Sequence, residues 1–431
     1  MATIAILGAS GLIGNALARD MQRRGFAVKA LARHFAPAQR AALGSDAVET
    51  PLVTLAPDEL ARLLADCDIV VNTIGILQGA ESEAVHHGFA ATLAALCAAS
   101  QKLLVHISIP GDAEDDKTLY SRSKRDGERA IAASGAPFVI LRPGFVIATA
   151  AYGGSALLRA LAALPLNLPA RESTSRFTAT AISDLCETLA VLVSRWRGGN
   201  RQWAHTWDVM ERAPGTVGDI VVAFRAHNGG PKPLLTTPAF LLPLGAVAGD
   251  MAAWAGWKPP IRSTAMAEMR RGVAGDPQGW MADTGIMPLS AQQAVAATPA
   301  SVQEKWFARL YLLKALALVT LVIFWCLSGL IALTVAFDHA RQILLDHGWS
   351  FGLAHGVTIG SSLLDIGIGL LISVRRTSAA GLVAGILVSL GYMAGAAVLT
   401  PELWIEPLGA LVKTGPAIVL MIFCLAMLDD W

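Results

Sequence analysis

Hydrophobic runs and helix-like segments alternate through the first 150 residues of the chain. The runs are rich in Val, Ile and Leu, and they read as buried strands: TIAILG, FAVKALA, AVETPLV, CDIVVNTIG, KLLVHISI and FVILRPGFVI. Continuous apolar strands separated by helices indicate a parallel sheet that is covered on both faces. We therefore predict an α/β fold with a Rossmann-type, doubly wound parallel sheet in a nucleotide-binding domain over residues 1–150.

The alternation stops after residue 150. Residues 151–304 are irregular and rich in Pro, Gly and Trp, and we predict that they form a small subdomain on the substrate side. Within it, the apolar stretch Ala239–Gly249 is too short to span a bilayer and contains Pro243. Two interpretations stay open for this stretch: a helix that covers the substrate cleft, or an interfacial helix that lies on a membrane.

The last part of the chain, residues 305–431, contains long apolar segments. Each is long enough to cross hydrocarbon, and few charges interrupt them. We predict a bundle of four transmembrane helices at about 315–337, 351–374, 377–401 and 407–428. The ionisable residues inside these segments are His355, Asp365 and Lys413.

Basic residues predict the orientation of the bundle. Lys305, Arg309 and Lys314 precede the first span, and Arg375 and Arg376 separate the second from the third, whereas the loop PELWIEP is acidic. The positive-inside rule then places both the N-terminal domain and the C-terminus in the cytoplasm. The first residues, MATIAILGAS, lack the basic region of a secretory signal. We expect a multi-pass protein of the inner (cytoplasmic) membrane, with the lipid bilayer as a partner.

Composition changes this picture little. The hydrophobic content of 54% and the mean hydropathy of +0.51 exceed those of soluble proteins and follow from the apolar C-terminal part. The net charge of +1 gives no support for a nucleic-acid partner. The cysteines are scattered, with no metal-ligand spacing, so we expect reduced, buried thiols and no metal site: Cys67, Cys97, Cys186, Cys326 and Cys424.

A glycine-rich loop follows the first expected strand. Residues 7–14 read LGASGLIG, with glycines at GxxGxxG spacing directly before a helix. The first glycine permits a tight turn, the second lets the backbone approach a pyrophosphate, and the third lets the helix pack on the sheet. The N–H groups at the start of the helix would then meet the anion. We predict dinucleotide binding by this loop: Gly8, Ala9, Ser10, Gly11, Leu12, Ile13 and Gly14.

The end of the second strand bears on the choice of cofactor. A carboxylate there would bind the ribose 2′-hydroxyl of NAD, but VKALARH has none and carries Arg33 and His34 instead. Arginine can pair with a 2′-phosphate in a forked geometry. This favours NADP(H) over NAD(H), although Arg33 as an ordinary surface residue stays the alternative.

A YxxxK pair provides the candidate chemistry. Tyr120 and Lys124 share a helix face, and a neighbouring ammonium is expected to lower the pKa of a phenol, which makes it a usable acid or base. Ser108 closes the preceding strand at the carboxyl edge of the sheet, where it could bind a substrate oxygen. The alternative is an incidental pair on a solvated helix face.

These motifs occur in the order of the short-chain dehydrogenase/reductases: GASGLIG, NTIG, HIS, YSRSK and LRPG. Over residues 1–300 the chain resembles their extended or atypical branch, in particular proteins similar to the nucleotide-binding accessory subunit of respiratory complex I. The resemblance implies that Ser108, Tyr120 and Lys124 form a catalytic set and that residues 175–185 frame the substrate side. It also implies that further residues lie along the cofactor: Asn72, Ile74, Gly75, Lys124, Pro143 and Phe145.

The chain departs from the family pattern in two places. The third strand is not followed by an Asp that would contact adenine, because none occurs before Asp58. The stretch between Ser108 and Tyr120 is short and acidic, which bears on the geometry of that pair. Atypical members of the family often keep the fold and the cofactor without the catalytic set.

The membrane part resembles a DoxX-like domain in its architecture and its place in the chain. Asp365 is its most conspicuous residue, since an ionisable group within a span normally faces the interior of a bundle. Depth argues against a pair with Lys413, which we expect to snorkel outward. We expect Asp365 to be neutral or hydrogen-bonded by Ser361 and Ser362, and a proton or quinone site there is a hypothesis.

Two functions follow from the sequence. The first is a membrane-anchored NADPH-dependent oxidoreductase that acts on a carbonyl, hydroxyl or quinone-like substrate. The membrane anchor favours a lipophilic substrate, because anchoring raises the enzyme's access to lipid-soluble molecules. The second is a catalytically silent NADPH-binding protein that supports a respiratory or membrane complex. Retention of the YxxxK pair favours the first.

Overall fold

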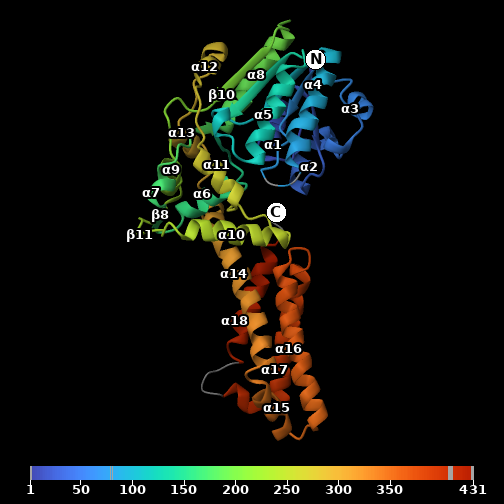
Figure 1. Ribbon diagram of the computed structural model, residues 1–431, viewed down its shortest axis with the longest axis vertical. Coiled ribbons are helices and arrows are strands. Elements are labelled where there is room, and N and C mark those ends of the chain that lie inside the picture. Colours follow the sequence, from blue (N-terminus) through green and yellow to red (C-terminus); the bar gives the residue numbers. More distant parts are fainter. Residues whose placement is uncertain (1, 78, 80, 406–410, 429–431) are drawn as a thin grey trace. The chain divides into compact units, whose positions relative to one another are not determined.

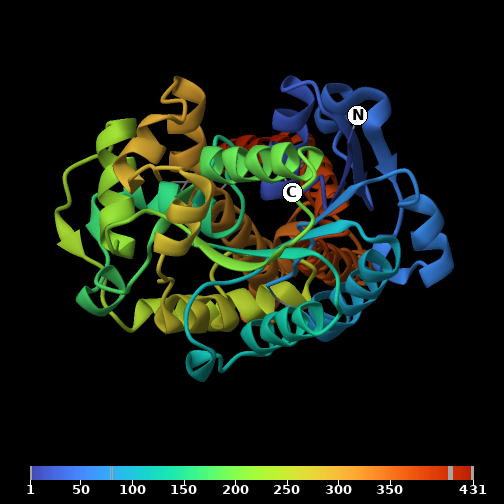
Figure 2. The same ribbon diagram turned by 90° about the horizontal axis from the view of Figure 1, so that it is seen from above.

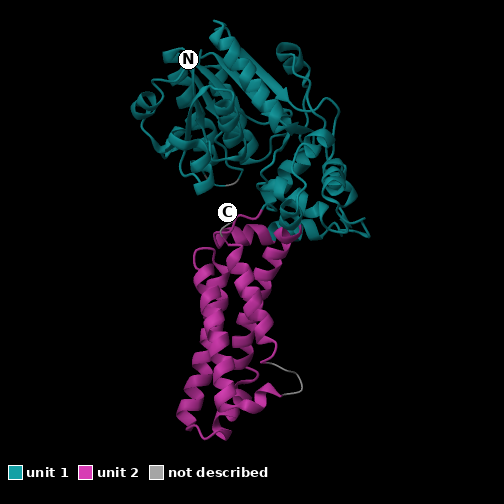
Figure 3. Ribbon diagram, turned by 180° about the vertical axis from the view of Figure 1, so that it is seen from behind, with its two compact units in different colours: residues 1–247, 260–308 teal, residues 248–259, 309–431 magenta. Residues whose placement is uncertain are grey.

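The computed structural model describes residues 2–77, 79, 81–405 and 411–428. The chain divides into two compact units (Figure 3). Unit 1 comprises Met1–Val247 and Pro260–Ala308, and unit 2 comprises Ala248–Pro259 and Arg309–Trp431. Each unit is described by itself.

Unit 1 is built on a parallel sheet of seven strands in the order β10-β6-β5-β4-β1-β2-β3. All six runs expected from the sequence contribute a strand, and β10 at one edge was not expected. The strands are β1 Thr3–Leu7, β2 Ala27–Ala32, β3 Ala47–Glu49, β4 Ile69–Asn72, β5 Leu103–Ile107, β6 Phe138–Pro143 and β10 Ala204–Val209. The predicted Rossmann-type α/β sheet is confirmed.

Helices cover both faces of this sheet (Figures 1 and 2). Helices α1 (Leu12–Arg23) and α8 (Ile182–Arg197) share one apolar core with side chains of the strands. On the other face, α3 (Pro57–Leu63), α4 (Phe89–Ser100) and α5 (Leu119–Ala132) share a second core. Alternate strand residues enter the two cores, as the pleat requires: Ile4 and Ile6 enter the first, Ala5 and Leu7 the second.

A smaller layer lies beside the sheet in unit 1. Strands β7 (Phe145–Ile147) and β9 (Ala179–Ala181) pair there, and α9 (Val217–Asn228) shares a third core with them. The further elements before the membrane helices are α2 Pro37–Leu43, a π-helical turn Ala84–Gly88, α6 Gly154–Ala162, β8 Leu166–Asn167, α7 Ala170–Ser173, β11 Leu235–Thr236, α10 Leu241–Trp254, which runs from unit 1 into unit 2, α11 Ser263–Arg271, α12 Gln278–Thr284 and α13 Ala291–Ala296.

Among the described residues, unit 2 contains three helices that are long and apolar enough to cross a membrane. They are α14 Val302–Leu333, α16 Phe351–Ser373 and α17 Ser378–Leu399. The first expected span, 315–337, extends too far along the chain. Helix α14 ends at Leu333, and a separate helix, α15, follows over Phe337–Asp346. The fourth expected span, 407–428, lies partly outside the described residues. Its described part contains α18, Thr414–Ala426.

Asp365 is buried between helices of this bundle. The Tyr392 hydroxyl of α17 donates to Oδ1 of Asp365 at 2.8 Å, and the Ser328 hydroxyl of α14 lies 3.4 Å from Oδ2. The expected partners Ser361 and Ser362 were wrong, since both hydroxyls donate to the Thr358 carbonyl oxygen of their own helix. Neighbouring helices therefore satisfy this carboxyl group. Lys413 is exposed.

Candidate functional site

The glycine loop joins β1 to α1 at the carboxyl edge of the sheet. Gly8 has φ +84°, and a Cβ there would lie 2.8 Å from Thr73 Oγ1. At Gly14 a Cβ would lie 2.3 Å from the Gly8 carbonyl oxygen. Both contacts are too short for a side chain, so the loop depends on glycine at these positions. Helix α1 then begins at Leu12 behind Gly11, whose position has no side-chain cap.

A pocket of about 330 Å³ opens beside this loop. Six predicted cofactor residues line it: Gly11, Leu12, Ile13, Gly14, Gly75 and Phe145. Thr73, within the NTIG motif, and Tyr152 also line it, and sequence reasoning missed Tyr152. The Thr73 hydroxyl donates to the Leu7 carbonyl oxygen at 2.7 Å and closes the loop against β1. Uncapped N–H groups and a glycine cradle fit the pyrophosphate of a dinucleotide.

Asn72 ends β4, and His106 lies beside it as the second-last residue of the neighbouring strand β5. Asn72 Nδ2 is 3.1 Å from His106 Nδ1, and Asn72 Oδ1 accepts from the Ile74 N–H at 3.1 Å. Asn72 therefore shapes the segment that leads to Gly75. Burial lowers the pKa of His106 well below its ordinary value, so the ring is neutral. His106 Nε2 is buried without a hydrogen-bond partner among the described residues.

Lys124 packs directly against the pocket wall. A Cβ at Gly75 would lie 3.3 Å from Lys124 Nζ, and the ammonium group donates to the Ile107 carbonyl oxygen at 3.0 Å. Burial lowers the pKa of Lys124 to about 8. With one such hydrogen bond among the described residues, the ammonium has donors left for a ligand such as the cofactor ribose.

Tyr120 lies on the same helix, α5, and contacts His86 edge to face with ring centroids 5.3 Å apart. His86 bridges two segments, since its Nε2 accepts from the Ile76 N–H at 3.1 Å and its Nδ1 lies 2.9 Å from Ser123 Oγ. Burial lowers the pKa of His86 to about 3, so this ring is neutral too. His86 therefore links the catalytic helix to the pocket wall, a role that no sequence motif indicated.

The expected activation of Tyr120 by Lys124 is not what the structure shows. Burial raises the pKa of Tyr120 to about 12, the Glu268 carboxylate adds to the rise, and Arg271 opposes it. The phenol hydroxyl makes no hydrogen bond to a described residue, and Lys124 is directed to Ile107 instead. Because burial and Glu268 outweigh the opposing charge of Arg271, the phenol favours its neutral form.

Ser108 follows β5 directly and is buried. Its N–H donates to the Leu141 carbonyl oxygen at 2.8 Å. Its hydroxyl lies near the Glu128 carboxylate but outside hydrogen-bond geometry, and it has no hydrogen-bond partner among the described residues. The hydroxyl is therefore enclosed, and Ser108 does not line the pocket beside the glycine loop. The roles of Ser108, Tyr120 and Lys124 in catalysis stay predictions.

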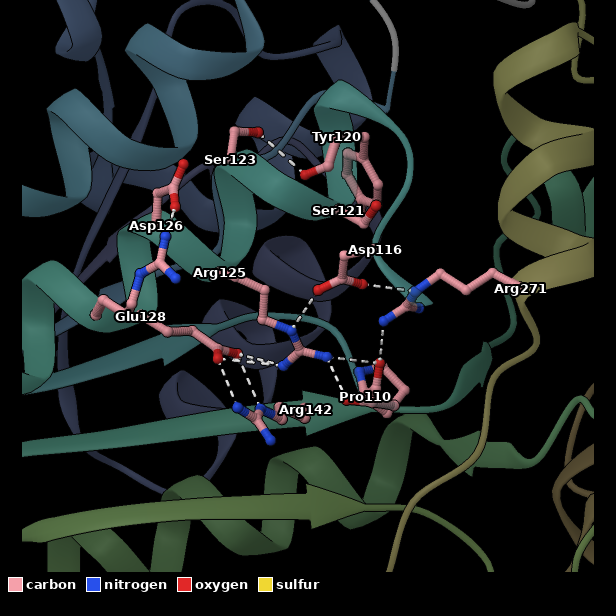
Figure 4. A network of polar contacts seen from close by, with 12 residues as sticks. Pro110, Asp116, Tyr120, Ser121, Ser123, Arg125, Asp126, Glu128, Arg142 and Arg271 are labelled. Carbon is pink, nitrogen blue, oxygen red and sulfur yellow. Dashed lines mark hydrogen bonds and ion pairs between the residues drawn. The ribbon is translucent and has the colours of Figure 1, made fainter. Parts of the chain in front are cut away.

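A buried network of ion pairs lies beneath the start of α5 (Figure 4). Asp116 accepts from Arg125 Nε at 2.9 Å and from Arg271 Nε at 2.7 Å. Glu128 accepts from Arg142 Nε at 2.9 Å. Burial raises the pKa of Glu128, but the hydrogen bonds and charge of Arg142 outweigh it and leave that pKa below its ordinary value. The network connects α5 and β6 to α11, which lies about 150 residues further along the chain.

Helix α11 is also tied to the N-cap of α5. The Thr118 hydroxyl caps α5 by accepting from the Ser121 N–H at 3.0 Å, and it donates to Glu268 of α11. The same Glu268 raises the pKa of Tyr120. Helix α11 therefore contacts the N-terminus of the candidate catalytic helix and contributes, after burial, to the pKa of Tyr120.

The expected phosphate ligands Arg33 and His34 follow β2 and are both exposed. His34 Nδ1 lies 3.2 Å from Oε1 of Glu49, which also accepts from the Phe35 N–H at 2.9 Å and from Arg40 Nη2 at 2.6 Å. The hydrogen bond from Arg40 lowers the pKa of Glu49. His34, after β2, and Arg40 of α2 thus share the Glu49 carboxylate. Pro143, at the end of β6, does not line the pocket.

Two known protein families match different parts of the chain. A family described as NAD(P)H-binding matches residues 8–184, and a DoxX-like family matches residues 322–422. No curated protein matches the chain.

Similar solved structures include the NAD-dependent NDP-hexosamine 5,6-dehydratase TunA, with 16% identity and a TM-score of 0.51 over 72% of this chain and 99% of that chain. A UDP-glucuronic acid 4-epimerase from Bacillus cereus in complex with NAD has 15% identity and a TM-score of 0.52 over the same shares. A dTDP-glucose 4,6-dehydratase from Bacillus anthracis with NAD has 13% identity and a TM-score of 0.51 over 72% and 98%. At these identities the likeness shows the fold.

Proposed function

Because the chain joins an NAD(P)-binding Rossmann domain like that of the short-chain dehydrogenase/reductases to a DoxX-like domain with apolar helices, we propose that it is a membrane-anchored NAD(P)H-dependent oxidoreductase. Its substrate is a carbonyl, hydroxyl or quinone-like compound. The membrane helices favour a lipophilic one, since anchoring raises local access to such molecules.

The packing of Lys124 against Gly75 carries this proposal. It places the YxxxK helix against the wall of the pocket that the glycine loop lines. When bound, NAD(P)H supplies the hydride. Tyr120 keeps its proton at neutral pH because its pKa is about 12, so the phenol carries a proton that it can give to a carbonyl oxygen. Lys124 has spare donors to orient the cofactor ribose. The Ser108 hydroxyl is unpaired but enclosed, so its role in binding the substrate oxygen rests on the family resemblance. With the Tyr120 phenol protonated, this arrangement favours reduction of a substrate carbonyl group.

The test compares Tyr120→Phe and Lys124→Met in the full-length protein reconstituted in lipid. We expect Tyr120→Phe to abolish NADPH oxidation with carbonyl and quinone substrates, while NADPH still raises the melting temperature. Lys124→Met should lose turnover and also weaken NADPH binding. Lys117→Met, an exposed lysine just before the same helix, is the matched control and should behave as the wild type. Equal turnover in Tyr120→Phe would refute the role of the phenol.

We further propose that the cofactor is NADP(H) in preference to NAD(H). Arg33 and His34 are exposed at the end of β2, where Glu49 is already engaged by Arg40. Arg33→Ala should weaken NADPH binding about tenfold, the loss of one charged contact, and leave NADH binding nearly unchanged. Arg62→Ala, an exposed arginine of α3, is the control. Titration of both cofactors by calorimetry measures this, and equal affinities of the wild type for the two would contradict it.

The second candidate is a catalytically silent NADPH-binding protein that supports a respiratory or membrane complex. The raised pKa of Tyr120 and the missing hydrogen bond between its hydroxyl and any described residue favour it. In that case NADPH would raise the melting temperature of wild type and Tyr120→Phe alike, and no substrate in the screen would be turned over. For either function we propose the inner membrane as the site, with unit 1 in the cytoplasm.

A further inference from the structure

Helix α10 presents a long apolar face that no described residue covers. Leu244, Val247, Met251 and Trp254 are 62, 55, 61 and 88% exposed. They recur at intervals of three and four residues, so they lie on one face of the helix. Phe240, directly before the helix, adds to it at 68% exposure. A continuous apolar stripe of this kind marks an interaction surface rather than a solvent-facing helix.

The C-terminal end of α10 is fixed to the end of the membrane spans. The Arg375 N–H donates to the Ala255 carbonyl oxygen at 2.9 Å, and Trp257 Nε1 donates to the Ser373 carbonyl oxygen at 2.7 Å. The guanidinium of Arg375 lies over the Trp257 ring, 5.7 Å from its centroid. Ser373 is the last residue of α16 and Ser378 the first of α17. These contacts therefore hold the segment at the level where two spans leave the hydrocarbon.

The direction of the segment agrees with a position in the membrane surface. Residues 248–259 belong to the same unit as the spans and run across the end of the bundle, crosswise to its helices (Figure 3). A helix that lies in the interface between headgroups and acyl chains has this orientation and an apolar face. Lys258 and Arg376 are exposed beside it, where basic side chains meet anionic headgroups.

We propose that α10 is an interfacial helix, with Met251 and Trp254 inserted into the headgroup and acyl boundary of the bilayer that the bundle crosses. Of the two interpretations of the Ala239–Gly249 stretch, this selects the membrane-surface helix. A second copy of the chain could also cover an apolar stripe. The bilayer is favoured because the contacts with Ser373 and Arg375 already place the end of α10 at the membrane edge.

The test uses the full-length protein in nanodiscs that contain anionic lipid, with an environment-sensitive fluorophore on a single cysteine at position 251 or 254. The matched control is the same label at Val222, which is 60% exposed on α9. Unmodified protein measures background from the native thiols. We expect blue-shifted emission at 251 and 254, and stronger quenching by a lipid label near the glycerol backbone than by one near the chain end. The label at 222 should show neither.

A second variant separates insertion from folding. Met251→Glu, labelled at 254, should lose the quenching, while the rise of melting temperature with NADPH stays as in the unsubstituted labelled protein. Water-like emission without quenching at both 251 and 254 would overturn the proposal. A second result would also overturn it: in detergent without lipid, the label becomes more shielded as the protein concentration rises. That result would assign the face to a second copy of the chain.

Discussion

At the scale of single residues, burial is the main cause of the raised pKa of Tyr120, and two residues far away in the sequence modify it. Glu268 raises the pKa further, and Arg271 lowers it. Lys124 is four residues away on the same helix, but its ammonium group donates to the Ile107 carbonyl oxygen.

We predict that Glu268→Gln lowers the pKa of Tyr120 from about 12, because it removes a negative charge and keeps an oxygen that can accept from Thr118. The chain has four tyrosines, so 3-fluorotyrosine can be incorporated and followed by 19F NMR, with Tyr120→Phe to assign the signal. Fluorination lowers the pKa of every phenol alike and preserves differences.

The Tyr120 signal should titrate at lower pH in Glu268→Gln than in the wild type. Because the folded-state pKa of Tyr120 is raised, the neutral phenol is retained as the pH rises through 10, where a free phenol begins to ionise. An unchanged titration of the Tyr120 signal in the variant would show that Glu268 does not act on Tyr120.

At the scale of elements, the docking of α11 on α5 depends on Asp116. Its side chain is 3% exposed and serves two arginines, Arg125 and Arg271, whose own side chains are 8 and 7% exposed. We predict that Asp116→Asn destabilises unit 1 by about 3–5 kcal/mol, because it leaves buried guanidinium groups without a counter-charge. Thermal unfolding of the full-length protein in detergent, followed by tryptophan fluorescence, measures the loss.

The matched control for that substitution is Asp126→Asn on α5. Asp126 pairs with Arg129, whose side chain is 78% exposed, and surface pairs of this kind contribute little. Its melting temperature should stay close to that of the wild type. Equal melting temperatures for the two variants would mean that the buried network does not hold α11 in place.

The elements also show what the sequence could predict. The buried strands and the glycine loop were predicted because their pattern is local: apolar runs and a fixed glycine spacing. Strand β10, AHTWDV, was missed because it lies at a sheet edge and carries polar residues. The contacts Asp116–Arg271 and Thr118–Glu268 join residues about 150 positions apart, and no spacing rule reaches that far. Those contacts join α11 to the start of α5, and His86 joins α5 to the segment after Gly75.

At the scale of the whole molecule, the membrane unit has two distinguishable ends. His347 Nε2, in the α15–α16 connection, lies 2.9 Å from Glu402 Oε1 in the turn after α17 (Pro401–Trp404), so these connections share one end of the bundle. The α16–α17 connection, with Arg375 and Arg376, lies at the other. The first end carries Asp338, Asp346 and Glu402, and positive-inside counting places the arginine end in the cytoplasm.

We predict that a membrane-impermeant maleimide labels Asp346→Cys on intact cells and labels Arg376→Cys only after permeabilisation. Both positions are exposed, and the described native cysteines are buried or partly buried, so the wild type should give a low background. The same result would place α10 at the cytoplasmic surface, since its end is bonded to the arginine connection. Labelling of position 376 from outside would reverse the proposed orientation of the bundle.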